Sequence, residues 1–228
     1  MKTVLITGAD RGIGAALCVA YAARGDSVLA VCLQDGAGLH GLNHIDIIPH
    51  VDVTDEGSVA GLVTKVGAHR LDVLINNAGI VIEQRFGAFD YSVFQREYAV
   101  NALGPLRVTE ALRPQLGPGS KIAIITSRVG SLGDNGSGGL YGYRMSKAAA
   151  NMAGINLAHE LRPFGISVIC LHPGSVRTAM TESLGDQSTV SSLNAPATAA
   201  EGLLAQIDEL DLDTTGRFRH ANGELLPW

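Results

Sequence analysis

Tyr143 and Lys147 are the pair of side chains in this sequence best suited to move a proton. They stand at i and i+4 in the segment Tyr141–Arg162, whose pattern predicts a helix, so their side chains share one face. A phenol with a pKa of about 10 is a weak acid at neutral pH, and a nearby ammonium favours its ionised form. Such a pair could protonate the alkoxide that forms when a carbonyl is reduced. Taken alone, a Tyr and a Lys at this spacing are more often ordinary neighbours on a helix surface.

Two serines and a second tyrosine compete for places beside this pair. Ser127 directly follows the apolar run Ser120–Thr126, which predicts a strand, whereas Ser131 comes a few residues later. A hydroxyl at the carboxyl end of a parallel strand faces the ligand crevice and could orient a substrate oxygen. We favour Ser127 for that reason and keep Ser131 as the alternative. The rival tyrosine, Tyr141, has the uncharged Met145 at i+4, so we interpret it as a wall residue.

The segment Thr7–Gly14 has the glycine content of a phosphate-binding turn between a predicted strand and a predicted helix. Its glycines permit tight turning and close approach of the backbone to a pyrophosphate, which the free N–H groups of the helix start would bind. The spacing Gly-x-x-x-Gly-x-Gly differs from Gly-x-Gly-x-x-Gly and from a Walker loop. Glycines also end strands for structural reasons, so this turn alone is weak evidence for a cofactor.

Five segments of the chain, spread over nearly its whole length, are similar in type and order to the motifs of the short-chain dehydrogenase/reductase family. They are Thr7–Gly14, Asp52–Val53, Asn76–Gly79, Tyr143–Lys147 and Pro173–Thr178. The resemblance implies hydride transfer between a nicotinamide cofactor and a small carbonyl/alcohol substrate. It implies a catalytic set of Asn101, Ser127, Tyr143 and Lys147, in which Asn101 holds a water for proton relay. Without the resemblance, Asn101 would be a structural residue inside a helix.

The same resemblance implies cofactor contacts at several strand ends. The residues are Gly8, Asp10, Arg11, Gly12, Ile13, Gly14, Asp52, Val53, Asn77, Ala78, Gly79, Tyr143, Lys147, Pro173, Gly174, Val176 and Thr178. The chain departs from the commonest family pattern in a longer Ser–Tyr spacing, which we place in an insertion at Asp134–Gly139. That spacing, the Tyr-x-Tyr-Arg-x-Ser-Lys context and the final Pro-Trp resemble the small C-factor/Sniffer-type carbonyl reductases.

The end of the second predicted strand bears on the choice of nicotinamide cofactor. An acidic residue there would bind the adenosine 2′-hydroxyl and reject a 2′-phosphate. The positions in question hold Cys32, Leu33 and Gln34, and Asp35 comes slightly too late. Arg11 can reach a 2′-phosphate, although it could also be an exposed arginine without a ligand. We therefore expect NADP(H) to be favoured over NAD(H).

Short apolar runs alternate with helix-length segments, and this alternation predicts one α/β domain over residues 1–228. Its fold would be a Rossmann-type, doubly wound, mostly parallel sheet of about seven strands with helices on both faces. The expected strands are Lys2–Thr7, Ser27–Leu33, Asp46–Val51, Leu71–Asn76, Ser120–Thr126, Ile166–His172 and Gly216–Arg219. The expected helices are Ile13–Arg24, Glu56–His69, a pair within Tyr91–Leu116, Tyr141–Arg162 and Ala197–Glu209.

Composition and charge exclude several classes of partner. The net charge of −5 argues against nucleic acid. The three cysteines are far apart without CxxC spacing, so we expect buried thiols in a reducing compartment and no metal site. The start lacks the apolar core of a signal peptide, and no segment has the ~20 apolar residues of a membrane span. These features favour a cytoplasmic protein.

Two further expectations concern assembly and access. The predicted helix Tyr141–Arg162 carries an apolar stripe that includes Met145 and Met152, and small residues that include Ala153 and Gly154. We expect the small residues to form a flat face for a partner helix, as in the four-helix interface of the family, giving a homodimer or, by extension, a tetramer. The polar segment Ser183–Asn194 is too short for a large lid, so we expect an open active site.

Two readings of function compete. The main one is an oxidoreductase, and the alternative is a regulatory or signalling protein that binds a dinucleotide without turnover. The presence of all four catalytic residues argues for the enzyme. A hydrolase is disfavoured because the sequence has no Gly-x-Ser-x-Gly elbow. His172 is interpreted as structural.

Overall fold

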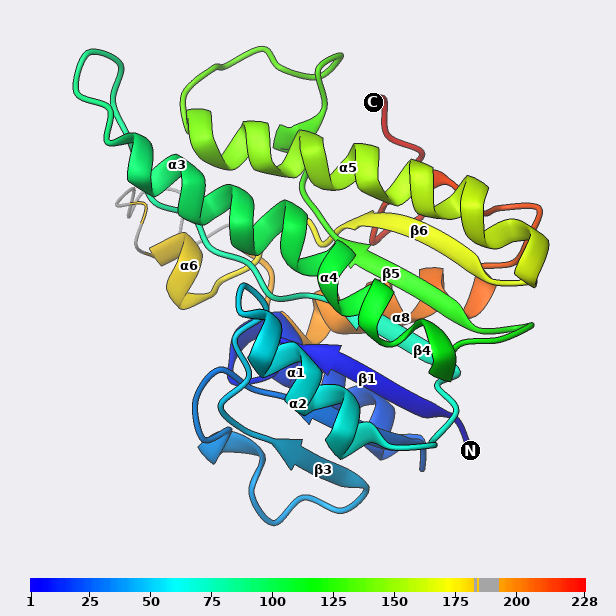
Figure 1. Ribbon diagram of the computed structural model, residues 1–228. Coiled ribbons are helices and arrows are strands. Elements are labelled where there is room, and N and C mark those ends of the chain that lie inside the picture. Colours follow the sequence, from blue (N-terminus) through cyan, green and yellow to red (C-terminus); the bar gives the residue numbers. More distant parts are fainter. Residues whose placement is uncertain (183, 185–192) are drawn as a thin grey trace.

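A seven-stranded, fully parallel sheet runs through the centre of the computed structural model, which describes residues 1–182, 184 and 193–228 (Figure 1). The strand order is β3-β2-β1-β4-β5-β6-β7. The bounds are β1 Thr3–Thr7, β2 Ser27–Val31, β3 Ile45–Ile48, β4 Val73–Asn76, β5 Lys121–Ile125, β6 Ser167–His172 and β7 Arg217–His220. The predicted α/β class, parallel sheet and number of strands are confirmed.

The order of the strands creates the crevice that a doubly wound sheet uses for ligands. β1 pairs with β2 on one side, where Leu5 aligns with Leu29, and with β4 on the other, where Leu5 aligns with Leu74. The chain therefore winds outward in both directions from β1, and the carboxyl ends of β1 and β4 flank the point of reversal. β1 and β4 are apolar nearly throughout because helices cover both faces of the sheet.

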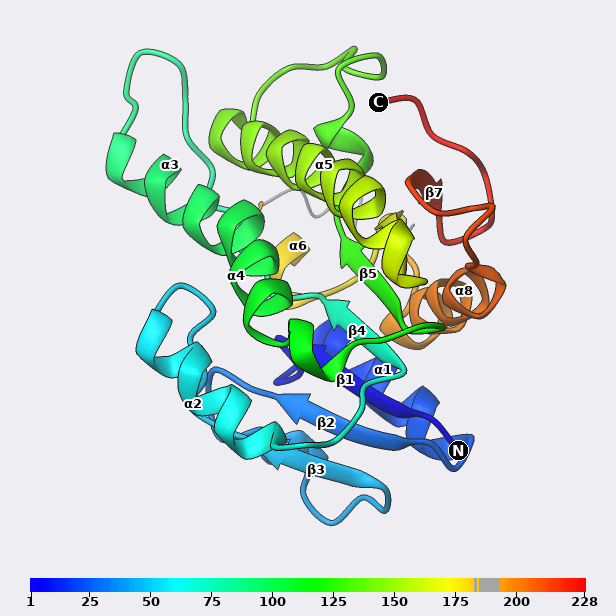
Figure 2. The same cartoon turned by 45° about the vertical axis from the view of Figure 1, so that its right-hand side comes forward.

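Helices cover the two faces in different combinations (Figure 2). α1 and α8 pack on one face, and α2, α4 and α5 pack on the other. The bounds are α1 Gly12–Ala23, α2 Glu56–Val66, α3 Tyr91–Tyr98, α4 Gly104–Ala111, α5 Tyr141–Leu161, α6 Ala179–Glu182 and α8 Pro196–Glu209. Shorter turns are η1 Ala37–Leu39, η2 Ala99–Leu103, η3 Arg113–Gln115, η4 Arg128–Gly130 and η5 Arg162–Phe164. No helix within the described ranges has the length and apolar character to cross a membrane.

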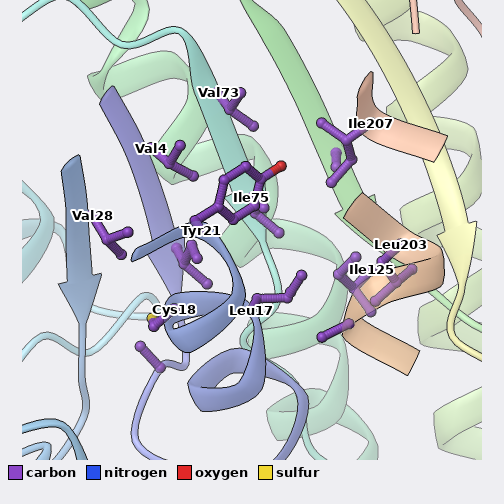
Figure 3. Packing of buried hydrophobic residues seen from close by; sticks show 14 of the residues in the cluster. Val4, Leu17, Cys18, Tyr21, Val28, Val73, Ile75, Ile125, Leu203 and Ile207 are labelled. Carbon is purple, nitrogen blue, oxygen red and sulfur yellow. The ribbon is translucent and has the colours of Figure 1, made fainter. Parts of the chain in front are cut away.

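The core on the α1 side is built from branched residues of the sheet and one aromatic ring (Figure 3). Tyr21 of α1 is fully buried and lies in one cluster with Val4 of β1 and Ile75 of β4. Leu203 of α8 belongs to the same cluster. The three cysteines are free and buried, as the sequence predicted. This packing fixes the start of α1 against the end of β1, where the glycine-rich turn lies.

The structure corrects our assignment of the two faces of α5. Ala153 is 7% exposed, and a Cβ on Gly154 would overlap the sulfur of Cys170 in β6. The small residues therefore face the sheet, because only they let the helix approach it closely. Met145 and Met152 are 61% and 59% exposed and lie on the outward face. Our prediction of a flat small-residue face for a partner helix was wrong.

Two other local predictions concern the helix pair before β5 and the segment after β6. The helix pair expected within Tyr91–Leu116 is present, but a π-helical turn, η2, joins α3 to α4. Such turns are rare and interrupt the regular α-helical register. The prediction of an open, lidless site depended on the segment Ser183–Asn194, which lies outside the described residues apart from positions 184, 193 and 194.

Candidate active site

The glycine-rich turn between β1 and α1 is packed so tightly that its glycines are required. Gly8 has a φ of 65°, and a Cβ there would lie 2.8 Å from the Cα of Ala78. A Cβ on Gly14 would overlap the carbonyl oxygen of Gly8. Gly12 also has a positive φ, 59°, and a Cβ on it would lie 3.3 Å from Cγ2 of Thr178. The turn thus brings the predicted motifs after β1, β4 and β6 together around one backbone cradle.

Thr7 and Asn77 fasten the ends of β1 and β4 to each other. The Thr7 hydroxyl accepts hydrogen bonds from the backbone N–H groups of Asn77 and Ala78, both at 3.1 Å. The Asn77 side-chain amide donates to the carbonyl oxygens of Thr7 and Gly8, both at 3.0 Å. Asn77 therefore has a definite structural role, in addition to the cofactor contact that the family resemblance implies.

Asp10 links the glycine-rich turn to the end of β2. Its carboxylate accepts hydrogen bonds from the backbone N–H groups of Leu33 and Gln34, at 2.9 and 2.7 Å. Arg11 follows at the N-cap position of α1 with extended backbone and an exposed side chain. Ile13, in the first turn of α1, packs against the core cluster of that face. The acidic side chain nearest the end of β2 is thus engaged by backbone amides.

The remaining predicted cofactor residues lie at the ends of β3 and β6. Asp52 accepts hydrogen bonds from the amide and hydroxyl of Thr54, at 2.8 and 2.7 Å. The carbonyl oxygen of Val53 accepts from Arg107 of α4 at 2.8 Å. After β6, a Cβ on Gly174 would lie 3.2 Å from Nε2 of His220. This segment after β6 holds four of the residues that we expected to contact the cofactor, namely Pro173, Gly174, Val176 and Thr178.

Tyr143 and Lys147 lie in the first two turns of α5, as predicted. Lys147 is 4% exposed, and its ammonium donates a hydrogen bond to the carbonyl oxygen of Ile125 at 2.9 Å. Its Nζ lies 5.7 Å from the centroid of the Tyr143 ring. The Ser127 hydroxyl lies near enough to the phenol to lower the pKa of Tyr143. Ser131 instead accepts from the amide of Asp134 at 3.1 Å, so Ser127 is the serine that the structure brings to the tyrosine.

Burial dominates the acid–base properties of this pair. The pKa of Tyr143 is raised to about 12 as the net result of three effects: burial raises it most, the Ser127 hydroxyl lowers it, and the charge of Glu97 raises it by a smaller amount. Burial also lowers the pKa of Lys147 to about 8. The expected lowering of the Tyr143 pKa by Lys147 is not among these effects. In the chain by itself, enclosure of the phenol outweighs the neighbouring ammonium.

Asn101 occupies the π-helical turn η2, and its side chain makes three hydrogen bonds. Its Oδ1 accepts a hydrogen bond from the amide of Ile80 at 2.8 Å, and its Nδ2 donates to the Ile80 carbonyl oxygen, also at 2.8 Å. Nδ2 donates further to the hydroxyl of Ser146 at 2.9 Å, which donates to the carbonyl oxygen of Tyr143. A Cβ on Gly79 would contact both Asn101 Oδ1 and Lys147 Nζ, at 3.2 and 3.4 Å. Asn101 is therefore brought to the catalytic helix, as expected.

Glu97 is a buried residue of this site that the sequence analysis missed. It is 0% exposed, and its Oε1 accepts a hydrogen bond from the amide of Ile82 at 2.8 Å. A Cβ on Gly142 would overlap its Oε2, so the carboxylate lies against the residue that precedes Tyr143. The sequence held a usable signal, because Glu97 and Asn101 stand at i and i+4 and a continuous helix would place both on one face.

Aromatic side chains gather where α5 begins. Tyr141 packs edge-on against Phe89 with ring centroids 5.0 Å apart, and Phe89 contacts Phe94 at the same distance. Phe86 and Tyr91, 81% and 69% exposed, extend the group outward. This arrangement agrees with the interpretation of Tyr141 as a wall residue rather than a proton donor.

His172 and the acidic residues do not form a second reactive centre within the described part of the chain. His172 packs edge-on against His220, with ring centroids 5.0 Å apart. Burial, followed by the neighbouring His220 and Arg128, lowers the pKa of His172 to about 3. No group of three or more His, Cys, Asp or Glu side chains suited to a metal ion occurs among the residues described. His172 is therefore held neutral, consistent with a structural residue.

Comparison with known proteins identifies the family. The model of the short chain dehydrogenase family matches residues 2–189, so the chain belongs to this family of oxidoreductases. The chain is 46% identical over 231 residues to 1-hydroxy-2-glutathionyl-2-methyl-3-butene dehydrogenase of Rhodococcus sp. (strain AD45), with both sequences fully covered. It is 45% identical over 168 residues to C-signal of Myxococcus xanthus. That alignment covers 72% of this chain and 97% of C-signal.

Solved structures agree with this assignment. The NADPH-bound carbonyl reductase from chicken fatty liver superposes with a TM-score of 0.88 at 28% identity, covering 100% of this chain and 99% of that one. The carbonyl reductase Sniffer of D. melanogaster gives a TM-score of 0.88 at 27% identity, covering 100% of both chains. The resemblance to the C-factor/Sniffer-type reductases is thereby confirmed.

Proposed function

We propose that this enzyme transfers hydride between NADP(H) and a small carbonyl/alcohol pair, with Tyr143 as the general acid and base. The observation that carries the proposal is the convergence of Ser127, Tyr143, Lys147 and Asn101 at the carboxyl ends of β4 and β5, beside a glycine cradle. Hydride supplied by a bound dihydronicotinamide turns the carbonyl oxygen into an alkoxide, which requires a proton. Tyr143 is the acid best placed to donate it.

The residues around the turn fit a dinucleotide. Positive φ angles at Gly8 and Gly12, together with a position 14 that admits no Cβ, give the backbone the tight path of a pyrophosphate-binding turn. The start of α1 directs free N–H groups and its positive dipole end toward the same place. Gly79 lies against both Lys147 and Asn101, so the end of β4 continues the site toward the catalytic helix.

The catalytic side chains divide the work in this proposal. Ser127 donates its one hydroxyl hydrogen to the substrate oxygen and so orients it. Lys147 supplies positive charge and a hydrogen bond to ribose. Because burial holds the pKa of Tyr143 at about 12 in the chain alone, ionisation of the phenol needs positive charge added nearby. A bound oxidised nicotinamide adds such charge, and Asn101 would hold the water that relays the proton onward.

The preference for NADP(H) is supported by the end of β2. Both oxygens of the Asp10 carboxylate already accept backbone hydrogen bonds, and the exposed Asp35 lies 3.3 Å from the His50 side chain, so the acidic side chain that the turn itself offers is engaged by the protein. Arg11 would pair with the 2′-phosphate. The NADPH-bound carbonyl reductase among the similar structures supports the same choice.

The relatives widen the range of substrates worth testing. The name of the Rhodococcus relative describes an alcohol that carries a glutathionyl group. The exposed aromatic group around Tyr141 offers an apolar surface at the start of α5, the helix that carries Tyr143, where part of such a substrate could pack. We also propose a homodimer, now through the outward face of α5 that carries Met145 and Met152. Sedimentation of a monomer at micromolar concentration would contradict the dimer.

A second candidate is a dinucleotide-binding signalling protein that does not depend on turnover. The 45% identity to C-signal favours it. One experiment distinguishes the two candidates. A panel of carbonyls and alcohols, including a glutathionyl alcohol, is assayed with NADPH, NADP, NADH and NAD, and turnover is followed by absorbance. Turnover with NADP(H) supports the enzyme proposal. Tight cofactor binding without turnover across the panel would favour the signalling protein instead.

A further inference from the structure

The carboxyl group of Glu97 is enclosed by three segments of the chain. The residue belongs to α3, which Figure 1 shows lying along α5, and it has no exposed surface. Its Oε1 accepts from the amide of Ile82, in the segment that follows β4, at 2.8 Å. Its Oε2 is also buried and has no hydrogen-bond partner within the described residues. Burying such a group with one oxygen unpartnered costs free energy, and a carboxyl kept in this state calls for a functional explanation.

The buried oxygen faces the start of α5. A Cβ on Gly142 would overlap Oε2 and would lie 2.6 Å from Cδ1 of Phe94, so position 142 can hold only glycine while Glu97 is in place. Gly142 is the residue directly before Tyr143. The amino end of a helix carries positive partial charge, which favours a carboxylate at this point. The same carboxylate interacts unfavourably with a negative charge on Tyr143.

We propose that Glu97 is a positioning residue for Tyr143: its buried carboxyl holds the segment after β4 at Ile82, packs against the first turn of α5 at Gly142, and sets a negative charge beside the phenol. This inference rests on the proposed role of Tyr143 and adds a residue that governs it. Glu97 does not contact substrate in this account. It determines where the phenol stands and how readily the phenol ionises.

The titratable groups around Glu97 fix the sign of the effect. Burial raises the pKa of Glu97, whereas the Ile82 amide and then the charge of Arg96, on the same helix, lower it. Tyr143 is the titratable group that faces it from α5, and its pKa is raised by the Glu97 charge. Replacing Glu97 by the neutral, isosteric Gln removes that charge, so the pKa of Tyr143 should fall.

The test is the pH profile of kcat/KM for the Glu97→Gln variant. The oxidation direction is measured, because oxidised nicotinamide supplies the positive charge that favours the ionised phenol. Oxidation needs that ionised phenol and rises as pH passes through its pKa, so this rise should move to lower pH by about 0.5 unit or more. The matched control is Glu83→Gln, because Glu83 is an exposed carboxylate next to Ile82. It should leave the profile where it is.

Two outcomes of the kinetic experiment overturn the inference. An unchanged profile in Glu97→Gln would show that the carboxylate does not act on Tyr143, and an equal shift in Glu83→Gln would show a general effect of surface charge. Hydrogen exchange adds a readout without turnover: the Ile82 amide should exchange at least ~10-fold faster in Glu97→Ala than in the Glu83 variant, because its acceptor is gone. An unchanged exchange rate would show that Glu97 does not hold the Ile82 amide. Full activity of Tyr143→Phe would instead refute the proposed function itself.

Discussion

The two sides of the crevice treat their polar side chains differently. Around the glycine-rich turn, Thr7, Asp10 and Asn77 each hold backbone groups of a neighbouring strand end. Around α5, by contrast, Lys147 and Glu97 are charged groups enclosed by the fold, and burial shifts both of their pKa values. The first side is a rigid backbone cradle built from satisfied hydrogen bonds. The second keeps charge in unfavourable surroundings, which is what tunes acids and bases.

The sharpest test of this contrast is Tyr143→Phe, which removes the transferable proton and keeps the ring. We expect turnover to fall at least ~10²-fold, while cofactor affinity stays nearly unchanged because the cradle is intact. Steady-state kinetics and a fluorescence titration with NADPH measure the two quantities. Lys147→Met should differ by weakening cofactor binding as well. A large loss of affinity in Tyr143→Phe would mean that the two sides are not separable.

The cradle is tested by Gly14→Ala. The added methyl overlaps the carbonyl oxygen of Gly8, so we expect a loss of about 1–3 kcal/mol in the free energy of unfolding and weaker cofactor binding. Gly61→Ala is the control, since a Cβ at this position in α2 meets no atom within 4 Å. It should stabilise the protein by about 0.4–1 kcal/mol. Urea unfolding measures the free energy of unfolding of both variants. An unchanged value for Gly14→Ala would mean that the turn can rearrange to accept the methyl group.

Cofactor choice can be examined with Arg11→Ala at the edge of the cradle. Loss of a charged hydrogen bond to the 2′-phosphate should weaken NADPH binding by about 1.5–3 kcal/mol and leave NADH binding almost unchanged. Calorimetry with both cofactors gives the comparison. Equal losses for NADPH and NADH would show that Arg11 does not read the phosphate, and a wild-type preference for NAD(H) would also remove the argument from Cys32, Leu33 and Gln34.

A smaller effect should appear in the stability of Lys147→Met. The native pKa of Lys147, about 8, lies below its ordinary value, so the unfolded chain binds more protons and burial of this group is unfavourable at neutral pH. Substitution should therefore raise the free energy of unfolding by about 1–2 kcal/mol at pH 7, after the lost hydrogen bond to Ile125 is counted. The gain should shrink as pH rises from about 8 towards 10.5. Denaturation at several pH values would show a constant gain if the charge of Lys147 were irrelevant.

Much of the cradle could be predicted from the sequence because its signals are local. Apolar runs give the strands, and the glycines at 8, 12 and 14 mark positions where the backbone has no room for, or strains against, a Cβ. The catalytic side was less accessible, since its features depend on packing between distant segments. Ser127 and Ser131 could be ranked but not separated until the loop was placed. Glu97, in a short helix with other polar residues, has the appearance of a surface residue.

The faces of α5 show the same limit. Alternating small and long apolar residues predict two faces but not which one meets the sheet. The contact between Gly154 and Cys170, from helix and strand, decides it. The opposed effects on the Tyr143 phenol were equally out of reach, because desolvation depends on how completely the fold encloses a group.

The π-helical turn η2 also constrains how this chain can change in length. A π-helical turn spans one residue more than an α-helical hydrogen-bonding interval, and here it lies between Glu97 and the helix α4 that packs on the sheet. Deleting one residue from Ala99–Leu103 would restore regular α-helical winding and remove the widened turn in which Asn101 lies. A deletion in the loop Asp134–Gly139 would leave that turn in place. Relatives of this sequence should therefore tolerate gaps in that loop and not in the turn.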